Sequence, residues 1–194
     1  MRFVLATRNA HKLRELGALL APHELEMLPA AVELPPESGS TFAENALIKA
    51  EAAAQATGRA ALADDSGIVV EALGGRPGIH SARYAGEHAT DEQNLAKLLI
   101  ELRGQEDRRA AYVCVLALAD PAGSPELFEG RCTGVLVSEP RGTGGFGYDP
   151  AFLPDDCATG DERTMAELPP GEKDEISHRG RAARALLDRL SVRA

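Results

Sequence analysis

The sequence predicts an α/β fold in which helices flank a mixed β-sheet. Two observations support this prediction: leucines and alanines recur at helical spacing after capping residues, and short apolar runs of strand length lie between these helical segments. The longest apolar run, residues 110–119, has the composition of a buried central strand. Because hairpin-like and crossover-like connections both occur, we expect a mixed sheet rather than a purely parallel one.

The first part of the chain predicts one strand and two helices. Residues 2–6 form a short apolar run, and leucines at helical spacing follow, with Asn9 at the position of a helix N-cap. After an irregular proline-rich stretch, Thr41 and Glu44 form a capping-box pattern. This pattern opens an alanine-rich helix, which we expect Gly58 to end.

The next segment predicts two short strands with a polar interruption. Residues 60–63 and 68–72 are β-like runs, and Asp64-Asp65-Ser66-Gly67 separates them. A glycine- and proline-rich loop follows at residues 74–78.

The second half of the chain predicts another helix, two strands and a closing helix. Thr90 and Gln93 form a second capping pattern before a leucine-lined helix, which we expect to end at Gly104. After the apolar run, residues 127–138 predict a returning strand. A helix from about Ser177 closes the chain.

Composition limits the possible functions. A length of 194 residues predicts a single domain over residues 1–194, and the absence of a long apolar run or leader predicts a cytoplasmic protein without a membrane partner. The three cysteines have neither disulfide-framework nor zinc-site spacing. A net charge of -9 disfavours nucleic-acid binding, so a polyanionic ligand must meet a local cluster of cations, a metal ion, or both.

Polar residues follow the first strand in the segment Thr7-Arg8-Asn9-Ala10-His11-Lys12. At a strand-to-helix junction, free backbone N–H groups and the positive end of the helix dipole favour an anion, to which Lys12 adds a charge. The alternative is that Thr7 and Asn9 only cap the helix and that Lys12 is solvated. The segment lacks the pattern of a Walker A loop.

The segment Asp64-Asp65-Ser66-Gly67 contains adjacent carboxylates, which suit Mg²⁺ because this ion takes a few hard oxygen ligands and shares substrate phosphates. In an extended backbone, only one of two adjacent side chains faces a given side. A helix cap or a turn is the alternative interpretation.

A glycine-rich loop, residues 142–147, matches the letters of the dinucleotide fingerprint G-x-G-x-x-G. The context differs, because Tyr148-Asp149-Pro150 follows instead of a helix, and we reject a Rossmann cofactor site. Phe146 on this loop could stack on a base, although filling a core is the commoner role of a phenylalanine.

Basic residues gather at the start of the last helix, in Ser177-His178-Arg179-Gly180-Arg181, with Lys173 upstream. Arg179 can donate planar hydrogen bonds to a keto oxygen. The alternative is a serine cap followed by a solvated basic helix start.

Taken in order, these segments resemble the noncanonical purine nucleoside triphosphate pyrophosphatase family, also called the inosine triphosphatase family. The resemblance is nearly chain-wide. It rests on Leu5-Ala6-Thr7 with Asn9 and Lys12, Thr41-Phe42 with Glu44-Asn45-Ala46 and Lys49, Ala63-Asp64-Asp65-Ser66-Gly67, Leu73-Gly74-Gly75 with Pro77-Gly78, Ser81-Ala82-Arg83-Tyr84, Gly144-Gly145-Phe146-Gly147-Tyr148-Asp149-Pro150, and Ser177-His178-Arg179-Gly180.

The resemblance implies an elongated α/β fold with a long mixed central sheet, two lobes with a cleft between them, homodimerisation and a magnesium requirement. It also implies hydrolysis of ITP, dITP and XTP to the monophosphate and pyrophosphate. Asp65 would act as general base, and Asp65 and Glu37 would hold the metal. The implied substrate-binding residues are Thr7, Arg8, Asn9, Ala10, His11, Lys12, Lys49, Ser66, Phe146, Gly147, Tyr148, Asp149, Lys173, His178 and Arg179. His11 and Arg8 depart from the family's usual residues.

Within this set, the lysines with Thr7 and Asn9 would hold the triphosphate. Phe146 would stack on the purine. The residues that would line the base pocket are Ser66, Tyr148, Asp149, His178 and Arg179. The cations and Mg²⁺ offset the charge of the triphosphate, and a carboxylate-activated water attacks the α-phosphorus. A donor such as Arg179 separates a 6-keto purine from adenine, while guanine must be excluded at its 2-amino group.

Three other functions are compatible with parts of this pattern. The first is a related pyrophosphatase that acts on other modified nucleotides. The second is a nucleotide-binding regulator without turnover, which the presence of Asp65, Glu37 and Lys12 disfavours. The third is an α/β oxidoreductase, which the misplaced glycine motif disfavours.

Overall fold

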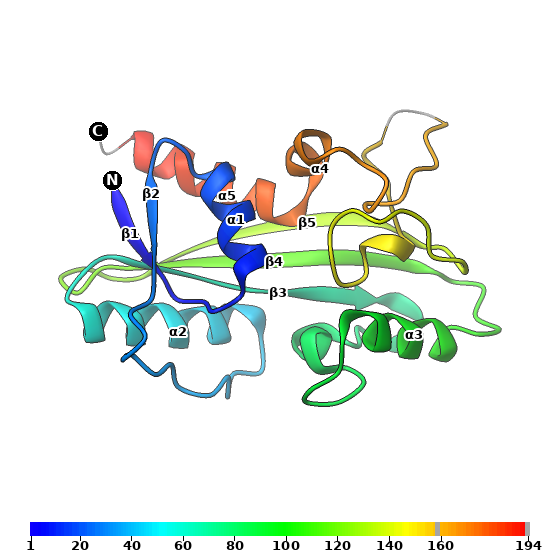
Figure 1. The fold of residues 1–194 in the computed structure, drawn as a ribbon, viewed down its shortest axis with the longest axis horizontal. Coiled ribbons are helices and arrows are strands. Elements are labelled where there is room, and N and C mark those ends of the chain that lie inside the picture. The colour runs from blue at the N-terminus through cyan, green and yellow to red at the C-terminus, as the bar shows by residue number, and fades with distance from the viewer. Residues whose placement is uncertain (158–159, 193–194) are drawn as a thin grey trace. The chain divides into compact units, whose positions relative to one another are not determined.

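The sheet is mixed, as the sequence predicts. In the computed structural model, which describes residues 1–157 and 160–192, the strand order is β2-β1-β3-β4-β5-β6 (Figure 1). Strand β1 pairs in parallel with β2 and β3, whereas β5 and β6 are antiparallel. The strands are β1 Arg2–Leu5, β2 Glu24–Met27, β3 Ala61–Val70, β4 Arg109–Ala119, β5 Glu126–Leu136 and β6 Phe152–Pro154.

The predicted helices all form. The α-helices are α1 Ala10–Leu19, α2 Phe42–Thr57, α3 Asp91–Glu101, α4 Pro170–Ile176 and α5 His178–Ser191, and short 3₁₀ helices cover Glu71–Leu73, Gly78–Arg83 and Asp149–Ala151. The sequence did not predict β2, β6 or α4, which are short and lack strong periodicity. No helix in the described part of the chain is long and apolar enough to span a membrane.

The helix caps follow local chemistry. The Asn9 side chain accepts from two backbone N–H groups of α1, and Thr90 with Gln93 makes a complete capping box on α3. Thr41 accepts from the Glu44 backbone as predicted, but the Glu44 carboxylate accepts from the backbone N–H and hydroxyl of Ser40, one residue before the cap. Gly58 ends α2 with a φ of 65°, which favours glycine.

Strand β3 corrects one prediction. The two short strands expected at residues 60–63 and 68–72 form one strand, Ala61–Val70, and the 3₁₀ helix begins at Glu71. The polar residues between them do not break the strand, because Asp64 and Asp65 are buried with cationic partners. Gly67 also has a packing role, since a Cβ there would lie 2.4 Å from Ser81 Oγ.

The chain forms two compact units. Unit 1 comprises Met1–Asp65, Cys114–Gly130 and Arg179–Ala194, and unit 2 comprises Ser66–Val113 and Arg131–His178. Each unit has a core of its own, and a single domain over residues 1–194 stays a prediction. Strands β3, β4 and β5 each contribute residues to both units.

In unit 1, alternating side chains of the strands pack on opposite faces. Phe3, Leu5 and Leu62 pack with the buried leucines of α1 and α5, whereas Val4 and Ala63 pack with the alanines of α2. Figure 1 shows α1 and α5 on one side of these strands and α2 on the other. Within unit 1, Leu62 of β3 therefore faces α1 and α5, and its neighbours Ala61 and Ala63 face α2.

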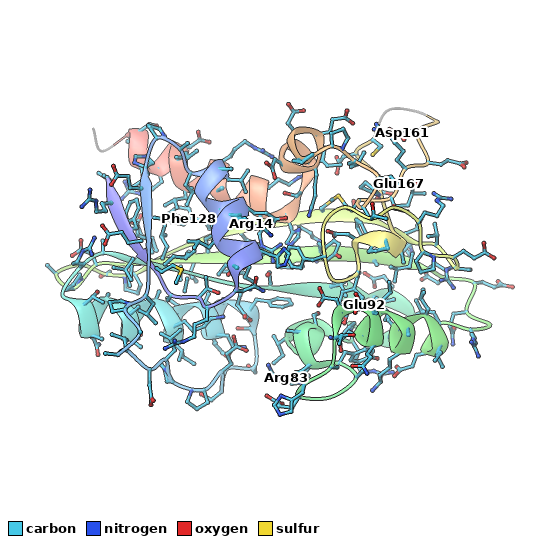
Figure 2. All side chains as sticks on the ribbon, viewed as in Figure 1. Arg14, Arg83, Glu92, Phe128, Asp161 and Glu167 are labelled. Atoms are coloured by element: carbon cyan, nitrogen blue, oxygen red, sulfur yellow. The ribbon has the colours of Figure 1, made fainter. Side chains whose placement is uncertain are left out.

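In unit 2, the leucines of α3 pack against buried side chains of β3, β4 and β5. This core also contains Tyr112 of β4, Phe152 of β6 and Tyr148 of the glycine-rich segment. Side chains stand on both faces of the strands (Figure 2). Packing in this core holds Tyr112 in place, and Tyr112 contacts the predicted site residues Asp149 and His178.

Candidate active site

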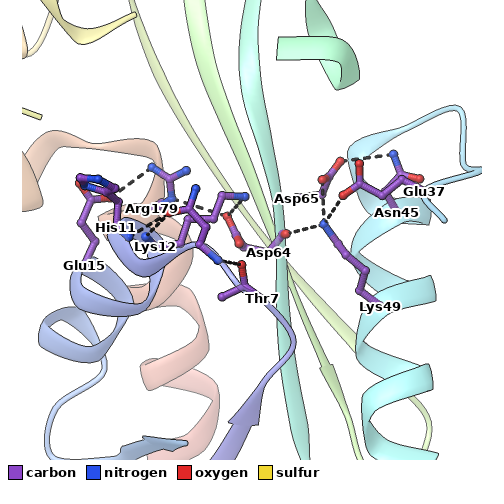
Figure 3. Close-up of polar contacts among 11 residues, drawn as sticks. Thr7, His11, Lys12, Glu15, Glu37, Asn45, Lys49, Asp64, Asp65 and Arg179 are labelled. Carbon is purple, nitrogen blue, oxygen red and sulfur yellow. Dashed lines mark hydrogen bonds and ion pairs between the residues drawn. The ribbon is translucent and has the colours of Figure 1, made fainter. Parts of the chain in front are cut away.

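Asp64 and Asp65 face opposite sides of β3, as two adjacent residues of a strand must. Figure 3 shows Asp64 directed toward Lys12 and Arg179, and Asp65 directed toward Lys49 of α2. The adjacent carboxylates therefore do not form one pair. Each has its own set of partners within unit 1.

Asp64 holds two cations from two helices. Its Oδ2 lies 2.9 Å from Lys12 Nζ of α1 and 3.6 Å from Arg179 Nε of α5. Glu15 Oε2 lies 3.2 Å from Nη1 of the same Arg179 guanidinium. Burial opposes ionisation of Asp64, but the charges of Lys12, Arg179 and Lys49 outweigh it, so its pKa lies well below the ordinary value. Asp64 is therefore a fixed negative charge.

Lys49 connects the predicted metal ligands. Its Nζ donates to Glu37 Oε1 at 2.7 Å, to Asp65 Oδ1 at 2.9 Å and to the Asp64 carbonyl at 2.9 Å. The Asn45 amide, one helical turn earlier on α2, donates to Asp65 Oδ2 at 3.4 Å. The pKa of Lys49 is raised, because the three carboxylates outweigh its desolvation.

Asp65 has the properties of a proton acceptor. Burial raises its pKa, and the Glu37 charge acts in the same direction, while Lys49 and Lys12 oppose the rise. A carboxylate with a raised pKa is a stronger base than an ordinary one once it is ionised. The two members of the Asp-Asp pair thus differ in basicity.

The predicted metal ligands converge. Oxygens of Glu37 and Asp65 both contact one ammonium group, so both can reach one cation between them. Within residues 1–157 and 160–192, no group of three or more His, Cys, Asp or Glu side chains is arranged to hold a metal ion. Two carboxylates nevertheless fit Mg²⁺, because this ion usually completes its shell with water and substrate phosphate oxygens.

The strand-to-helix junction differs from the expectation of free amides. Asn9 Oδ1 accepts from the backbone N–H groups of His11 and Lys12, and Thr7 Oγ1 accepts from the Asn9 N–H. The capping alternative therefore describes Thr7 and Asn9. Lys12, by contrast, is not a solvated lysine, because its side chain is only 17% exposed and is paired with Asp64.

Arg8 and His11 of this segment contact other residues of unit 1. Arg8 donates to the Val32 carbonyl at 3.0 Å. Arg14 lies 2.9 Å from His11 Nδ1, and Ala10 is the first residue of α1.

Unit 2 contains a second group of predicted site residues around Asp149. Its Oδ2 accepts from Lys173 Nζ at 2.9 Å and from the Phe146 backbone N–H at 3.0 Å. Lys173 Nζ also lies 5.3 Å from the centre of the Phe146 ring. Gly145 has a φ of 69°, and a Cβ there would lie 2.1 Å from Asp149 Oδ2, so this position requires glycine.

Tyr112 lies against the same group from β4. Its hydroxyl donates to Asp149 Oδ1 at 3.0 Å, and its ring stacks on His178 with centroids 4.6 Å apart. His178 and Arg179 are both buried, which contradicts a solvated start of the last helix.

Three further predicted residues also lie in unit 2. The Tyr148 hydroxyl donates to the Ser81 carbonyl at 2.8 Å, and burial raises the pKa of this phenol. The Gly147 N–H donates to Asp91 at 2.8 Å, and Ser66 is half-buried on β3.

The structure groups the predicted residues in two sets. In unit 1 it brings together Lys12, Glu37, Lys49, Asp64, Asp65 and Arg179, and in unit 2 it brings together Phe146, Asp149, Lys173 and His178. Lys173 was predicted to hold phosphate, yet it pairs with Asp149, a predicted base-pocket residue. Arg179 was predicted to contact the base, and it lies with Asp64 and Glu15.

Sequence reasoning missed three contacting residues. Asn45 is recognisable, because it precedes Lys49 by one turn on the same helix. Glu15 similarly follows Lys12 by three residues on α1. Tyr112 carries no signal, since it lies within an apolar run that is typical of a core strand.

This mixed α/β architecture with helices on both sides of a sheet is shared by solved Ham1 proteins. The Ham1 protein of Staphylococcus aureus matches over 100% of both chains with a TM-score of 0.89 and 38% identity. A HAM1 protein from Coxiella burnetii matches over 98% of both chains with a TM-score of 0.86 and 44% identity.

Sequence comparison gives the same relationship. A curated relative, the dITP/XTP pyrophosphatase of Geobacter sulfurreducens, is 52% identical over 97% of this chain and 96% of its own length. The model of the Ham1 family matches residues 3–189. The chain belongs to the Ham1 family, which confirms the resemblance seen in its motifs.

Proposed function

We propose that this chain is an enzyme that hydrolyses noncanonical purine nucleoside triphosphates, such as XTP, ITP and dITP, to the nucleoside monophosphate and pyrophosphate. The observation that carries the proposal is the arrangement of Glu37 and Asp65 on one lysine, because it combines a convergent carboxylate pair with a base of raised pKa. The relationship to curated dITP/XTP pyrophosphatases supports the choice of substrate.

In this proposal, Lys12, Lys49 and Lys173 bind the triphosphate together with Thr7 and Asn9. Lys12 and Lys49 each contact carboxylates, so their ammonium groups are held in place before substrate arrives. Preorganised cations stabilise the charge that develops on the leaving pyrophosphate. Asp65 orients a water molecule and accepts its proton as the oxygen attacks the α-phosphorus, and the bond from that phosphorus to the bridging oxygen breaks.

Glu37 and Asp65 would hold Mg²⁺. When bound, this ion neutralises phosphate charge and polarises the phosphorus–oxygen bonds. Lys49 contacts both carboxylates, so it can keep these two side chains in place. None of these contacts distinguishes one purine base from another.

The purine is proposed to stack on Phe146. Phe146 presents an aromatic ring on a loop that Asp149 fixes, and Tyr148, Gly147 and Ser66 complete the predicted lining. Arg179 would donate to the 6-keto oxygen, and Glu15 with Asp64 would orient its guanidinium.

The identity of the products tests the proposal. Purified protein is incubated with ITP, XTP, dITP, GTP or ATP, with and without Mg²⁺, and early products are separated by ion-exchange chromatography. We expect monophosphate and pyrophosphate from the first three substrates, far slower turnover of GTP and ATP, and no turnover with chelator. Diphosphate plus free phosphate as initial products would contradict the proposal.

We also propose that the chain is a homodimer, which rests on the family resemblance. Light scattering after size-exclusion chromatography should give twice the 20.5 kDa of one chain. A mass of one chain at micromolar concentration would contradict a stable dimer.

A further inference from the structure

Tyr112 contacts two predicted base-pocket residues at once, although the sequence marks it only as part of a core strand. Its ring lies 4.6 Å from the His178 ring with an angle of 8° between the planes. Its hydroxyl donates to Asp149 at 3.0 Å. All of these residues belong to unit 2.

The Asp149 carboxylate connects Tyr112 to the glycine-rich loop through hydrogen bonds. Asp149 Oδ1 accepts a hydrogen bond from the Tyr112 hydroxyl, and Oδ2 accepts from the Lys173 ammonium and from the Phe146 backbone N–H. The Asp149 side chain is 5% exposed, so water contributes little to its solvation and the protein donors fix its orientation. Because the Phe146 backbone N–H donates to this carboxylate, a shift of Asp149 moves the loop that carries the Phe146 ring, which is proposed to stack on the base.

Tyr112 is itself held firmly. It lies on β4, is 7% exposed, and meets the Phe152 ring edge-on with centroids 4.8 Å apart. A side chain on a packed strand defines geometry better than one on a loop. Tyr112 can therefore serve as a fixed reference for His178 on one side and for Asp149 and its loop on the other.

We propose that Tyr112 is a positioning residue for base selection, which aligns the His178 ring by stacking and the Asp149 carboxylate by its hydroxyl. This inference rests on the proposed function and deepens it. Tyr112 acts through other residues and takes no part in the attack on phosphorus, so its loss changes which bases are accepted more than how fast a bound triphosphate reacts.

The test uses Tyr112→Phe, which keeps the stacked ring and removes the hydroxyl, and Tyr112→Leu, which removes both. The matched control is Tyr84→Phe, because the Tyr84 hydroxyl also donates to a carboxylate of unit 2, Glu101, at 2.6 Å. For each full-length protein, kcat and KM are measured for ITP, XTP, GTP and ATP with Mg²⁺, together with the thermal unfolding midpoint.

For Tyr112→Phe we expect an ITP-to-ATP ratio of kcat/KM about tenfold lower than wild type, mainly through KM for ITP, with kcat within about threefold. Tyr112→Leu should lower the ratio further. Tyr84→Phe should leave the ratio unchanged. A merely structural role would lower the unfolding midpoint of Tyr112→Phe while the ratio stays within twofold of wild type, and this result would overturn the inference.

A double-mutant cycle supplies an independent measurement. If the hydroxyl acts through the carboxylate, Tyr112→Phe should change the base ratio in wild type but not in an Asp149→Asn background. Equal changes in both backgrounds would also overturn the inference. Failure of the proposed function is distinguishable, because wild-type protein itself would then fail to prefer ITP and XTP.

Discussion

Replacing Asp64 with asparagine tests whether the first carboxylate of the Asp-Asp pair is structural and the second catalytic. Asp64 is fully buried and lies between Lys12 and Arg179. Asparagine keeps the shape and one acceptor oxygen but removes the negative charge. The substitution therefore leaves two cations on the α1 and α5 side of β3 without their shared counterion.

The expected magnitude follows from the exposure of these groups. Removing one partner of a buried ion pair costs about 3–5 kcal/mol. Lys12 retains 17% exposure, and Arg179 keeps Glu15 as a partner, so we expect the lower end of this range, about 3 kcal/mol. For a chain of this length, that loss corresponds to about 6–12 °C in the unfolding midpoint.

Urea unfolding at neutral pH and differential scanning calorimetry measure the loss, and steady-state turnover well below the midpoint measures activity. We expect Asp64→Asn to lose at most about tenfold in kcat, because this residue contacts no reacting atom in the proposed mechanism. A variant as stable as wild type, or one whose folded form loses as much turnover as Asp65→Asn, would refute this reasoning.

The pH dependence gives a second check. The pKa of Asp64 is lower in the folded protein, so the folded state binds this proton more weakly than the unfolded state does. Its contribution to stability is therefore complete above the unfolded pKa near 3.9 and is lost as the pH falls below that value. The stability difference between wild type and Asp64→Asn should shrink by about 1 kcal/mol from pH 7 to pH 3.

The remaining predictions concern catalysis and substrate holding. Asp65→Asn should lose roughly 10²-fold or more in kcat while it remains folded by circular dichroism, and near-wild-type turnover with Mg²⁺ would move the base elsewhere. Lys12→Ala and Lys49→Ala should lower kcat/KM for ITP, XTP and ATP by a common factor, since a phosphate contact carries no base information, and an altered ITP-to-ATP ratio would contradict their placement. Arg179→Ala should cost roughly 1–3 kcal/mol in kcat/KM for ITP and XTP but little for ATP, whereas equal losses would place Arg179 with the phosphate or the fold.

The sequence could predict features that depend on neighbouring residues. Asn9 and Thr90 cap the helices they were expected to cap, because capping needs only a side chain and the next few amides. The buried strand at residues 110–119 was predicted because an apolar run of that length has few other uses. The mixed α/β class followed from the order of such elements.

Features that depend on distant partners could not be predicted in the same way. The break expected within residues 60–72 is wrong, because the cost of burying Asp64 and Asp65 is offset by lysines on two different helices. The ion pair of Lys173 with Asp149, 24 residues earlier in the chain, was likewise not expected from the sequence. Local patterns carry no information on such pairs.

The Asp-Asp pair shows how a strand gives two identical residues different chemistry. Because neighbouring side chains on β3 point to opposite faces, Asp64 meets the cations of α1 and α5, and Asp65 meets Lys49 of α2 with Glu37 beside it. The charges of Lys12, Arg179 and Lys49 hold the pKa of Asp64 down, whereas burial and a second carboxylate raise that of Asp65. An insertion of one residue between them would place both side chains on one face, where the mutual repulsion of two carboxylates would replace this division. The alternation of the strand is therefore the feature that separates a structural carboxylate from the proposed general base.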